Sequence, residues 1–280
     1  MSMLQYPSGK FHESGKEILA DIDVDIAQTV RDAVDRNMHN WDYKAPVVGT
    51  SGVGKSTFER QFGMYAKYYL KTKYNIDVDV HIAMDGAEFE EIAQRVPKYS
   101  IIILDEAFAD MNSNVSRSKD FQRIVNMLQI IRQKSYIILM SLPNFFDLSK
   151  SIALFQTNHL FVVDTSKEGI RGVIRVYDKD KKQALYLKGK KEMNYYCVKP
   201  NYLARFYKNA KAMDNESYEK KKTEHFMNLN KKLEKITPKS ERNNILFKLK
   251  QDYHFKIGDL EKVSGLKQAN IYKILETYRD

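Results

Sequence analysis

The 280-residue sequence has little of what secreted and membrane proteins need. Its one cysteine, Cys197, cannot form a disulfide within the chain and therefore fits a reducing compartment. No apolar run approaches the ~18 residues that span a bilayer, because the strongest runs, Ile101–Leu104 and residues 136–140, have the length of single strands. The N-terminus also lacks the basic and then apolar segment of a signal peptide. These absences predict a cytoplasmic protein without membrane insertion, located in the host cytoplasm if the protein is viral.

The sequence shows no pattern for a metal centre built from histidine and cysteine. Its six histidines are scattered, and Cys197 has no Cys or His partner at ligand spacing. Hydrophobic residues nevertheless make up 43% and aromatic residues 12%, which suffices for a packed core and excludes a mostly disordered chain. A chain of this length has room for one large domain with an appendage or for two modest domains.

Charge is distributed unevenly along the chain. Residues 1–165 carry 18 Lys and Arg against 21 Asp and Glu, a net charge of −3, whereas residues 166–280 carry 28 against 15, a net charge of +13. The first part therefore resembles an ordinary catalytic domain in its charge, and the second part predicts a surface that binds a polyanion. The alternative is that the lysines are only a solvated surface.

Short apolar runs alternate with amphipathic segments between residues 46 and 163. The runs are apolar on both faces, which is typical of parallel strands covered by helices on both sides. We expect strands at residues 46–48, 77–84, 101–104, 136–140 and 160–163, and helices at residues 57–69, 86–96 and 121–132. The pattern predicts an α/β fold with a mostly parallel sheet.

The flanking segments predict further parts. Residues 1–44 are expected to be a helical lead-in, with a helix over residues 17–37 in which apolar residues recur at four-residue steps. Residues 45–208 would be the core, ending in a β-hairpin whose strands at 172–178 and 184–188 flank a charged turn at 179–183. Residues 209–240 are rich in Lys and Glu and predict a charged helical linker, and residues 241–280 predict a compact final module.

Residues 49–56 match the phosphate-binding pattern G-x-x-x-x-G-K-[ST] in full. Glycines let successive backbone N–H groups point at a phosphate, and the following helix adds the positive end of its dipole. Lys55 is expected to reach the β- and γ-phosphates, and the Ser56 hydroxyl to bind Mg²⁺. The pattern predicts that the chain binds ATP with Mg²⁺. The expected nucleotide-binding residues are Gly49, Thr50, Ser51, Gly52, Val53, Gly54, Lys55, Ser56 and Thr57.

An acidic pair, Asp105 and Glu106, ends the apolar strand at Ile101–Leu104. Strand ends of a parallel sheet meet at one edge, so this pair is expected beside the phosphate loop. Asp105 would hold Mg²⁺ through water, and Glu106 would orient and deprotonate the attacking water. The combination predicts an ATPase that hydrolyses ATP to ADP and phosphate.

At this point the sequence resembles the FtsK/HerA-type DNA-pumping ATPases. Residues 46–56 resemble their phosphate loop, in which a Gly-Thr-Thr-Gly-x-Gly-Lys-Ser form recurs. Residues 105–111 resemble the Asp-Glu-Phe-Ala-Asp segment of FtsK with one residue inserted, and residues 139–143 take the place of its Thr-Gln-Arg-Pro segment. Residues 152–163 fit the next helix and strand. The similarity covers residues 46–163. It implies an ATP-driven DNA translocase that assembles as a homo-oligomeric ring, which we expect to be a hexamer.

The sequence departs from that family at the sensor of the γ-phosphate. Ser141 and Leu142 stand where the family has a glutamine, and Asn144 lies three residues after Ser141. Asn144 is either the replacement sensor or a turn cap after Pro143, and the sequence leaves both open. The core is also far shorter than a bacterial chromosome translocase, which suggests a minimal motor of a virus, plasmid or other mobile element.

Ring motors of this class complete each active site with an arginine from a neighbouring subunit, which stabilises charge on the transferring phosphoryl group. The candidates are Arg132, just before the strand at 136–140, then Arg117 and Arg123. The alternative for each of them is an ordinary surface arginine. Trp41 and Tyr43, before the first strand of the core, would either stack on adenine or fill the edge of the core, and the second role is favoured.

The final module has the pattern of a helix-turn-helix. Helices are expected at residues 241–254, 257–263 and 267–278, with a tight turn at Gly265 and apolar residues at the inward positions. The exposed face of the last helix would then carry DNA-contacting residues: Lys267, Gln268, Asn270 and Lys273. Gln and Asn can pair with adenine, and lysines contact phosphate or guanine. A small bundle that docks on protein is the alternative.

Taken together, the sequence predicts an ATP-dependent DNA motor with a helix-turn-helix tail. Two other functions remain open. One is a segregation or replication factor in which ATP controls assembly on DNA without translocation. The other is a signalling ATPase whose tail binds protein. DNA-stimulated ATP turnover and displacement of a roadblock distinguish the motor from the first, and DNA binding at low salt distinguishes it from the second.

Overall fold

The computed structural model describes residues 2–105, 131–166, 168–206, 215–234, 238–251 and 256–277. The chain divides into two compact units, Met1–Asn215 and Glu216–Asp280, and each is described by itself. In the described residues, no helix combines the length and the apolar character that crossing a membrane requires.

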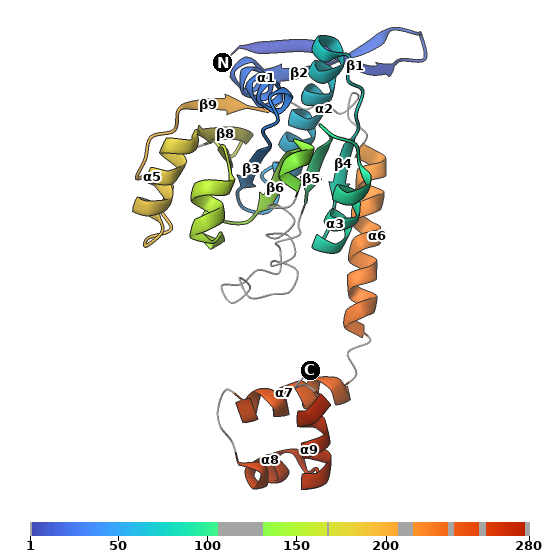
Figure 1. Cartoon of the computed structure of the whole chain (residues 1–280), viewed down its shortest axis with the longest axis vertical. Helices are drawn as coiled ribbons and strands as arrows, with labels where there is room; N and C mark the ends of the chain where they lie inside the picture. The colour runs from blue at the N-terminus through green and yellow to red at the C-terminus, as the bar shows by residue number, and fades with distance from the viewer. Residues whose placement is uncertain are drawn as a thin grey trace. The chain divides into compact units, whose positions relative to one another are not determined.

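The first unit is built on a seven-stranded sheet with the strand order β4-β5-β6-β3-β7-β8-β9 (Figure 1). The strands β4, β5, β6, β3 and β7 run parallel. At the edge beyond β7, β8 pairs antiparallel with β7 and β9 pairs antiparallel with β8. This arrangement confirms the predicted α/β fold with a mostly parallel sheet. The strands are β3 (Tyr43–Val48), β4 (Val80–Ala83), β5 (Ile101–Leu104), β6 (Ile137–Leu142), β7 (Leu160–Thr165), β8 (Arg171–Tyr177) and β9 (Tyr202–Arg205).

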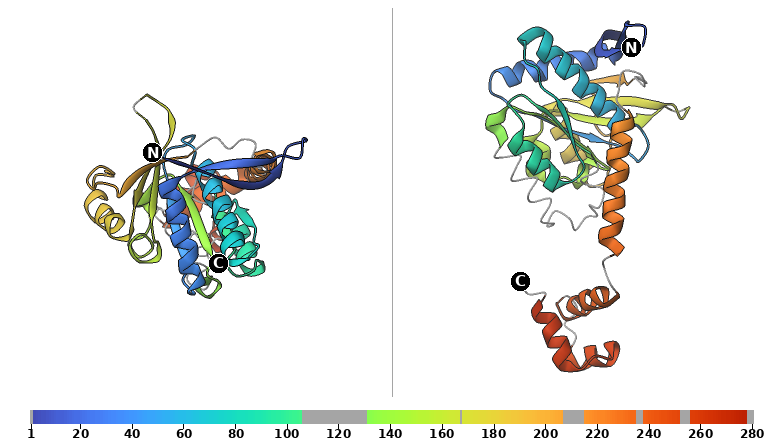
Figure 2. Two further views of the ribbon diagram at one scale, coloured as in Figure 1. Left: turned by 90° about the horizontal axis from the view of Figure 1, so that it is seen from above. Right: turned by 90° about the vertical axis from the view of Figure 1, so that its right-hand side faces the viewer.

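Helices cover both faces of the sheet because the central strands are apolar on both sides. In β5, Ile101 and Ile103 belong to the core beneath α1 (Val24–Met38) and α2 (Lys55–Tyr74). The alternate residues Ile102 and Leu104 belong to the core shared with α3 (Gly86–Arg95) and α5 (Lys179–Gly189). Figure 2 shows α1 and α2 side by side on their face of the sheet.

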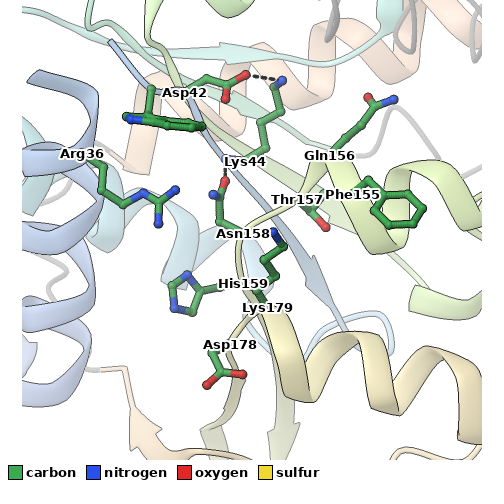
Figure 3. Close-up of a pocket in the computed structure, with 11 residues that line it drawn as sticks. Arg36, Asp42, Lys44, Phe155, Gln156, Thr157, Asn158, His159, Asp178 and Lys179 are labelled. Carbon is green, nitrogen blue, oxygen red and sulfur yellow. Dashed lines mark hydrogen bonds and ion pairs between the residues drawn. The ribbon is translucent and has the colours of Figure 1, made fainter. Parts of the chain in front are cut away.

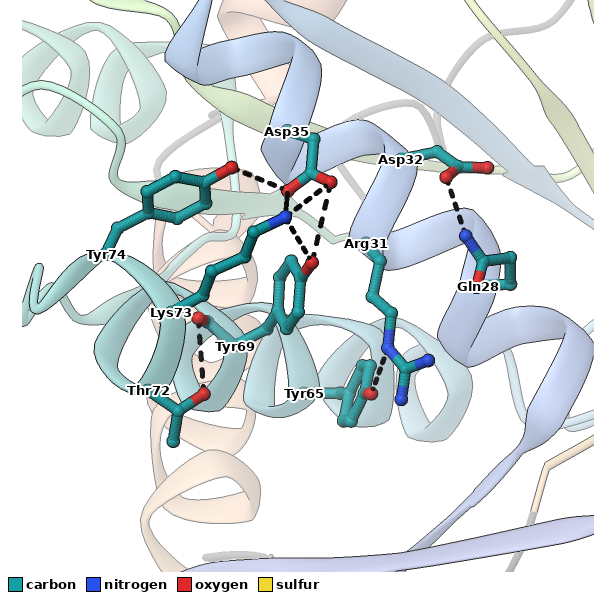
Figure 4. A network of polar contacts seen from close by, with 9 residues as sticks. All are labelled: Gln28, Arg31, Asp32, Asp35, Tyr65, Tyr69, Thr72, Lys73 and Tyr74. Carbon is teal, nitrogen blue, oxygen red and sulfur yellow. Dashed lines mark hydrogen bonds and ion pairs between the residues drawn. The ribbon is translucent and has the colours of Figure 1, made fainter.

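The contact between α1 and α2 is reinforced by a polar network. Lys73 Nζ donates to both carboxylate oxygens of Asp35 at 2.9 Å, and the Tyr74 hydroxyl donates to Asp35 Oδ1 at 2.9 Å. Arg31, four residues before Asp35, donates from its Nε to the hydroxyl of Tyr65, eight residues before Lys73, at 2.8 Å (Figure 4). The network fixes α2 at its C-terminal end, and α2 begins at the phosphate loop.

The N-terminal segment corrects one prediction. The helix expected over residues 17–37 is shorter, because Glu17–Asp23 is strand β2, which pairs antiparallel with β1 (Met3–Phe11). Only the remainder is helical, as α1. Residues four apart lie on the same face of a strand as well as of a helix, so the four-residue apolar step did not distinguish the two. Asp23 ends the strand and caps α1 by accepting from Asp25 N at 3.0 Å.

A second correction concerns the hairpin expected at residues 172–188. Its first strand exists as β8, but residues 179–188 belong to the helix α5. Asp178 is the reason, because its Oδ1 accepts from Lys181 N at 2.9 Å and so caps the helix. The charged residues expected in a turn are the first turn of this helix. The hairpin at this end of the core is instead formed by β7 and β8.

The second unit contains helices joined by short connections. They are α6 (Asn215–Glu234), which begins at the unit boundary, α7 (Pro238–Gln251), α8 (Ile257–Ser264) and α9 (Gln268–Thr277). Leu246, Leu260 and Ile271 form the buried centre of α7, α8 and α9. Gly265 ends α8 with φ of 67°, and its N–H donates to Glu261 O at 2.9 Å. Helix α8 and the start of α9 agree with the predicted ranges to within one residue, whereas α7 begins at Pro238, three residues before its predicted start. The assignment of these helices as a helix-turn-helix stays a prediction. Their role in binding DNA stays a prediction.

Candidate nucleotide-binding site

The phosphate loop lies between the end of β3 at Val48 and the start of α2 at Lys55. Strands β3, β6 and β5 are neighbours with a parallel register that pairs Val48 with Leu142 and Leu104 with Met140. The carboxyl ends of these strands therefore meet at one edge of the sheet. This is the edge at which ligands bind in open α/β sheets.

Two glycines of the loop have no space for a side chain. A Cβ on Gly49 would lie 2.3 Å from the backbone oxygen of Val163 in β7. A Cβ on Gly54 would lie 2.2 Å from the ring of Phe206, and Gly54 has φ of 104°, which disfavours any residue with a side chain. Close contacts with Val163 and Phe206 therefore restrict the conformation of the loop, and this conformation depends on how the fold packs around it.

Lys55 lies over the loop that it follows. Its Nζ donates to Gly49 O at 2.7 Å and to Thr50 O at 3.1 Å. These carbonyls hold the ammonium above the loop, where a phosphate group cradled by the backbone N–H groups would meet it. The position fits the predicted role of Lys55 in binding the β- and γ-phosphates.

Ser56 and Asp105 come together at the same edge. Ser56 Oγ donates to Asp105 Oδ1 at 3.2 Å, and Asp105 is 1% exposed. A hydroxyl and a carboxylate are hard oxygen donors, the type that Mg²⁺ selects. The two side chains therefore fit the predicted magnesium site, in which Ser56 would bind the ion directly and Asp105 would hold it through water.

Glu59 is a feature of the site that the sequence analysis missed. It is fully buried one turn beyond Lys55, and neither carboxyl oxygen has a hydrogen-bond partner among the described residues. Burial raises the pKa of Glu59 well above its ordinary value, the charge of Asp105 raises it further, and Lys55 opposes both. The only available signal was its position four residues after Lys55, on the helix face that carries Lys55.

Of the other predicted catalytic residues, some lie outside the described part of the chain. Glu106, Arg117 and Arg123 lie outside the described residues. Arg132 lies in a short 3-10 helix, η2 (Ile131–Lys134), which precedes β6, and its side chain is not described. The roles of these residues stay predictions.

Asn144 follows β6 at the same edge of the sheet and caps the 3-10 helix η3 (Phe145–Asp147). Its Oδ1 accepts from Phe146 N at 3.3 Å and from the Tyr195 hydroxyl at 2.7 Å. Its Nδ2 donates to Asp147 Oδ1 at 3.3 Å. The described contacts are therefore those of a turn cap, and a sensor role would require some of them to be exchanged for contacts with the nucleotide.

Two contacts join the end of the first unit to the phosphate loop and its helix. Phe206 directly follows β9, and its ring lies against Gly54. The backbone N–H of Phe206 donates to Gly172 O at 3.1 Å. Arg60 Nη2, one turn into α2, donates to Asn215 Oδ1 at 2.9 Å, and Arg60 Nε donates to Ser56 O at 3.3 Å. These residues are distant in sequence, so no local pattern indicated that they reach the site.

Trp41 and Tyr43, near the start of β3, differ in their burial. Tyr43 is 1% exposed, stacks on Phe62 with ring centroids 5.9 Å apart, and is part of the core, as favoured from the sequence. Trp41 is 50% exposed and lies two residues before β3, at the end of that strand opposite the phosphate loop. It is therefore not placed to stack on a nucleotide bound at the loop.

The predicted DNA-contacting residues are all exposed on or beside α9: Lys267, Gln268, Asn270 and Lys273. Gln268 Nε2 donates to Glu261 Oε2 on α8 at 2.7 Å, which fixes this amide relative to the preceding helix. The exposed face is compatible with the predicted role. Contact of these residues with DNA stays a prediction.

Comparisons with known proteins add little to this picture. No protein-family model and no curated protein sequence matches the chain. The N-terminal domain of zonular occludens toxin from Neisseria meningitidis is 15% identical with a TM-score of 0.35, covering 49% of this chain and 84% of that one. A genome-packaging NTPase of Sulfolobus turreted icosahedral virus 2, in complex with AMP, is 16% identical with a TM-score of 0.35, covering 50% and 94%.

A KaiC-like protein from Pyrococcus horikoshii is 13% identical with a TM-score of 0.30, covering 50% of this chain and 79% of that one. Similarity this low carries no inference about function. The resemblance to FtsK/HerA-type ATPases therefore stays a prediction from the sequence.

Proposed function

We propose that this protein is an ATP-dependent DNA motor of a virus, plasmid or other mobile element. The observation that carries the proposal is the meeting of Ser56 with Asp105 at 3.2 Å, directly after a complete phosphate-binding pattern. A phosphate loop alone explains binding of a nucleotide. A buried acid at the hydroxyl of that loop supports a magnesium site, which phosphoryl transfer would need.

The residues divide the work of hydrolysis among them. The loop N–H groups and Lys55 bind and orient the phosphates, and Ser56 and Asp105 would hold Mg²⁺, which supplies positive charge at the β- and γ-phosphate oxygens. Glu106, next to Asp105, would orient the attacking water and accept its proton. The water oxygen bonds to the γ-phosphorus as the bond to the β,γ-bridging oxygen breaks, so the products are ADP and phosphate.

An oligomeric ring would complete the site. We expect Arg132, with Arg117 as the next candidate, to reach the γ-phosphate of a neighbouring subunit and to stabilise the transition-state charge. Arg132→Ala should then bind ATP normally but lose turnover. Mixing it with Glu106→Gln subunits should restore part of the activity, because each variant supplies what the other lacks. Full turnover by Arg132→Ala alone would remove Arg132 from this role.

The tail would bring DNA to the motor. Residues 166–280 carry a net charge of +13, of which +11 belongs to residues 166–240 and +2 to residues 241–280. Neutralising phosphates releases counterions, so most of this electrostatic gain would come from the residues before the tail, and the tail would add base contacts. Gln268 and Asn270 would read bases, while Lys267 and Lys273 would contact phosphate. Deleting residues 241–280 should leave basal ATP turnover intact, weaken DNA binding and remove sequence preference. Gel shifts at a series of salt concentrations would measure both effects.

The deciding experiment measures ATP turnover with and without DNA, followed by displacement of a protein roadblock from DNA. If the protein is a motor, DNA should increase its ATP turnover, and the protein should displace the roadblock. Lys55→Ala should lose nucleotide binding, whereas Glu106→Gln should keep ATP bound without hydrolysis. Turnover that does not respond to DNA, together with an unmoved roadblock, would favour the factor that uses ATP only to assemble on DNA.

A further inference from the structure

A cavity of about 550 Å³ lies at the edge of the sheet where β3 and β7 begin (Figure 3). The phosphate loop follows the other end of β3, so the two sites are at opposite edges of the sheet. The cavity has the volume of a typical small-molecule site. No step of the proposed hydrolysis uses it.

Hydrogen bonds hold the floor of the cavity together. Lys44 N donates to Asn158 Oδ1 at 2.8 Å, and Asn158 N donates to Lys44 O at 2.7 Å, which ties β3 to the segment before β7. His159 is held by a hydrogen bond between its Nδ1 and the Tyr43 hydroxyl at 3.1 Å. A preformed floor lowers the entropic cost of binding a ligand.

The rim combines exposed rings with cations. Trp41 is 50% exposed and Phe155 is 72% exposed. The guanidinium of Arg36 lies 5.7 Å from the centroid of the Trp41 ring, and Lys179 is exposed at the first position of α5. Aromatic surface beside cations is the combination that binds bases and phosphates of single strands.

The charges of the lining leave an excess of one positive charge. Lys44 forms an ion pair with Asp42, and the Asp178 carboxylate offsets one of the two remaining cations, Arg36 and Lys179. Neither of those two cations forms an ion pair with a carboxylate within the described ranges. A single excess charge matches the monoanionic phosphodiester of a strand better than the dianion of a free nucleotide.

We propose that this cavity binds a nucleotide of single-stranded nucleic acid, with its base against Trp41 and its phosphate at Arg36 and Lys179. The site is separate from the phosphate loop, and the proposal does not rest on the proposed motor function. A free nucleoside monophosphate offers the same chemistry, so the test compares the two sources.

Trp41 is the only tryptophan of the chain, so its fluorescence reports on this cavity alone. The full chain would be titrated with a short oligothymidylate, with dTMP and with deoxyribose 5-phosphate, in the wild type and in Lys55→Ala. We expect the oligothymidylate to quench Trp41 equally in both proteins, because the phosphate loop is not involved. We expect dTMP to quench only at higher concentration and deoxyribose phosphate not to quench, since stacking on Trp41 needs a base.

Three variants test the cations. Arg36→Ala and Lys179→Ala should each weaken the quenching roughly tenfold, a loss of about 1.4 kcal/mol. Lys188→Ala, an exposed lysine on α5 away from the cavity, is the matched control and should bind like the wild type. Circular dichroism of each variant would show that it is folded.

Two results would overturn the proposal. One is the absence of quenching while a filter assay shows that the oligothymidylate is bound elsewhere on the chain. The other is an equal effect of Lys188→Ala and Lys179→Ala. Quenching by dTMP at the same concentration as by the oligothymidylate would instead keep the nucleotide site and overturn its assignment to a strand.

Discussion

The Ser56 hydroxyl donates a hydrogen bond to Asp105 Oδ1 at 3.2 Å, across 49 positions of sequence. Ser56 is the second residue of α2, and Asp105 directly follows β5. The two strands that lead to these residues, β3 and β5, are separated by β6 in the sheet. The pair therefore depends on the order of the strands as well as on the two sequence motifs.

Ser56→Ala should abolish the gain in ATP affinity that Mg²⁺ provides. The variant removes an expected ligand of the ion and leaves the backbone N–H groups of the loop and Lys55 in place. Titration with a fluorescent ATP analogue, with and without Mg²⁺, measures this difference. Thr72→Ala removes a hydroxyl from the far end of α2 and should keep the full magnesium effect. Equal magnesium dependence in both variants would exclude Ser56 as a ligand.

Gly54→Ala should destabilise the protein more than Gly52→Ala. Both glycines have positive φ, 104° and 79°, so both substitutions carry backbone strain of about 1–2 kcal/mol. Only at Gly54 would the new Cβ also meet the Phe206 ring, whereas nothing lies within 4 Å at Gly52. Thermal unfolding measures the difference, and Phe206→Ala in the Gly54→Ala background should reduce it. An equal loss of stability in the two single variants would show that Phe206 does not press on the loop.

Glu59→Gln should change how stability depends on pH. Burial raises the pKa of Glu59 above its ordinary value of 4.5, so the folded protein holds a proton that the unfolded chain releases as pH rises. Stability from this group is complete below about pH 4.5 and is lost at higher pH. The variant should match the wild type near pH 4.5 and exceed it at pH 8 in urea unfolding. Parallel pH profiles for the two proteins would contradict the assigned protonation.

Titration of His159 should lower the stability of the protein as pH falls, whereas titration of Glu59 lowers it as pH rises. Burial lowers its pKa from 6.5 to about 4, so the unfolded chain binds a proton before the folded protein does as pH falls. The contribution of His159 is complete above about pH 6.5 and is lost toward pH 4, by up to about 3 kcal/mol. His159→Gln should lose less stability over that interval. An NMR titration of the histidine would measure the pKa directly, and a value near 6.5 would refute the prediction.

Much of the fold follows from local chemistry that the sequence displays. The run Ile101–Leu104 is apolar on both faces, so it predicted a strand covered on both sides, and both cores use it. The pattern at residues 49–56 indicated the phosphate loop between β3 and α2, and Gly265 indicated the turn between α8 and α9. In each case the residue types required for the local conformation are adjacent in the chain.

Tertiary structure decided what local patterns leave open. Ile18 and Ile22 share a face in a helix and in a strand, and pairing with β1 decided for the strand. Lys179 and its neighbours were charged enough for a turn, and the Asp178 cap made them a helix. The burial of Glu59, the approach of Phe206 to Gly54 and the place of Trp41 in a cavity opposite the phosphate loop arise from segments distant in sequence. Only packing brings such segments together, because burial and shape depend on the whole fold and periodicity reports only on neighbours.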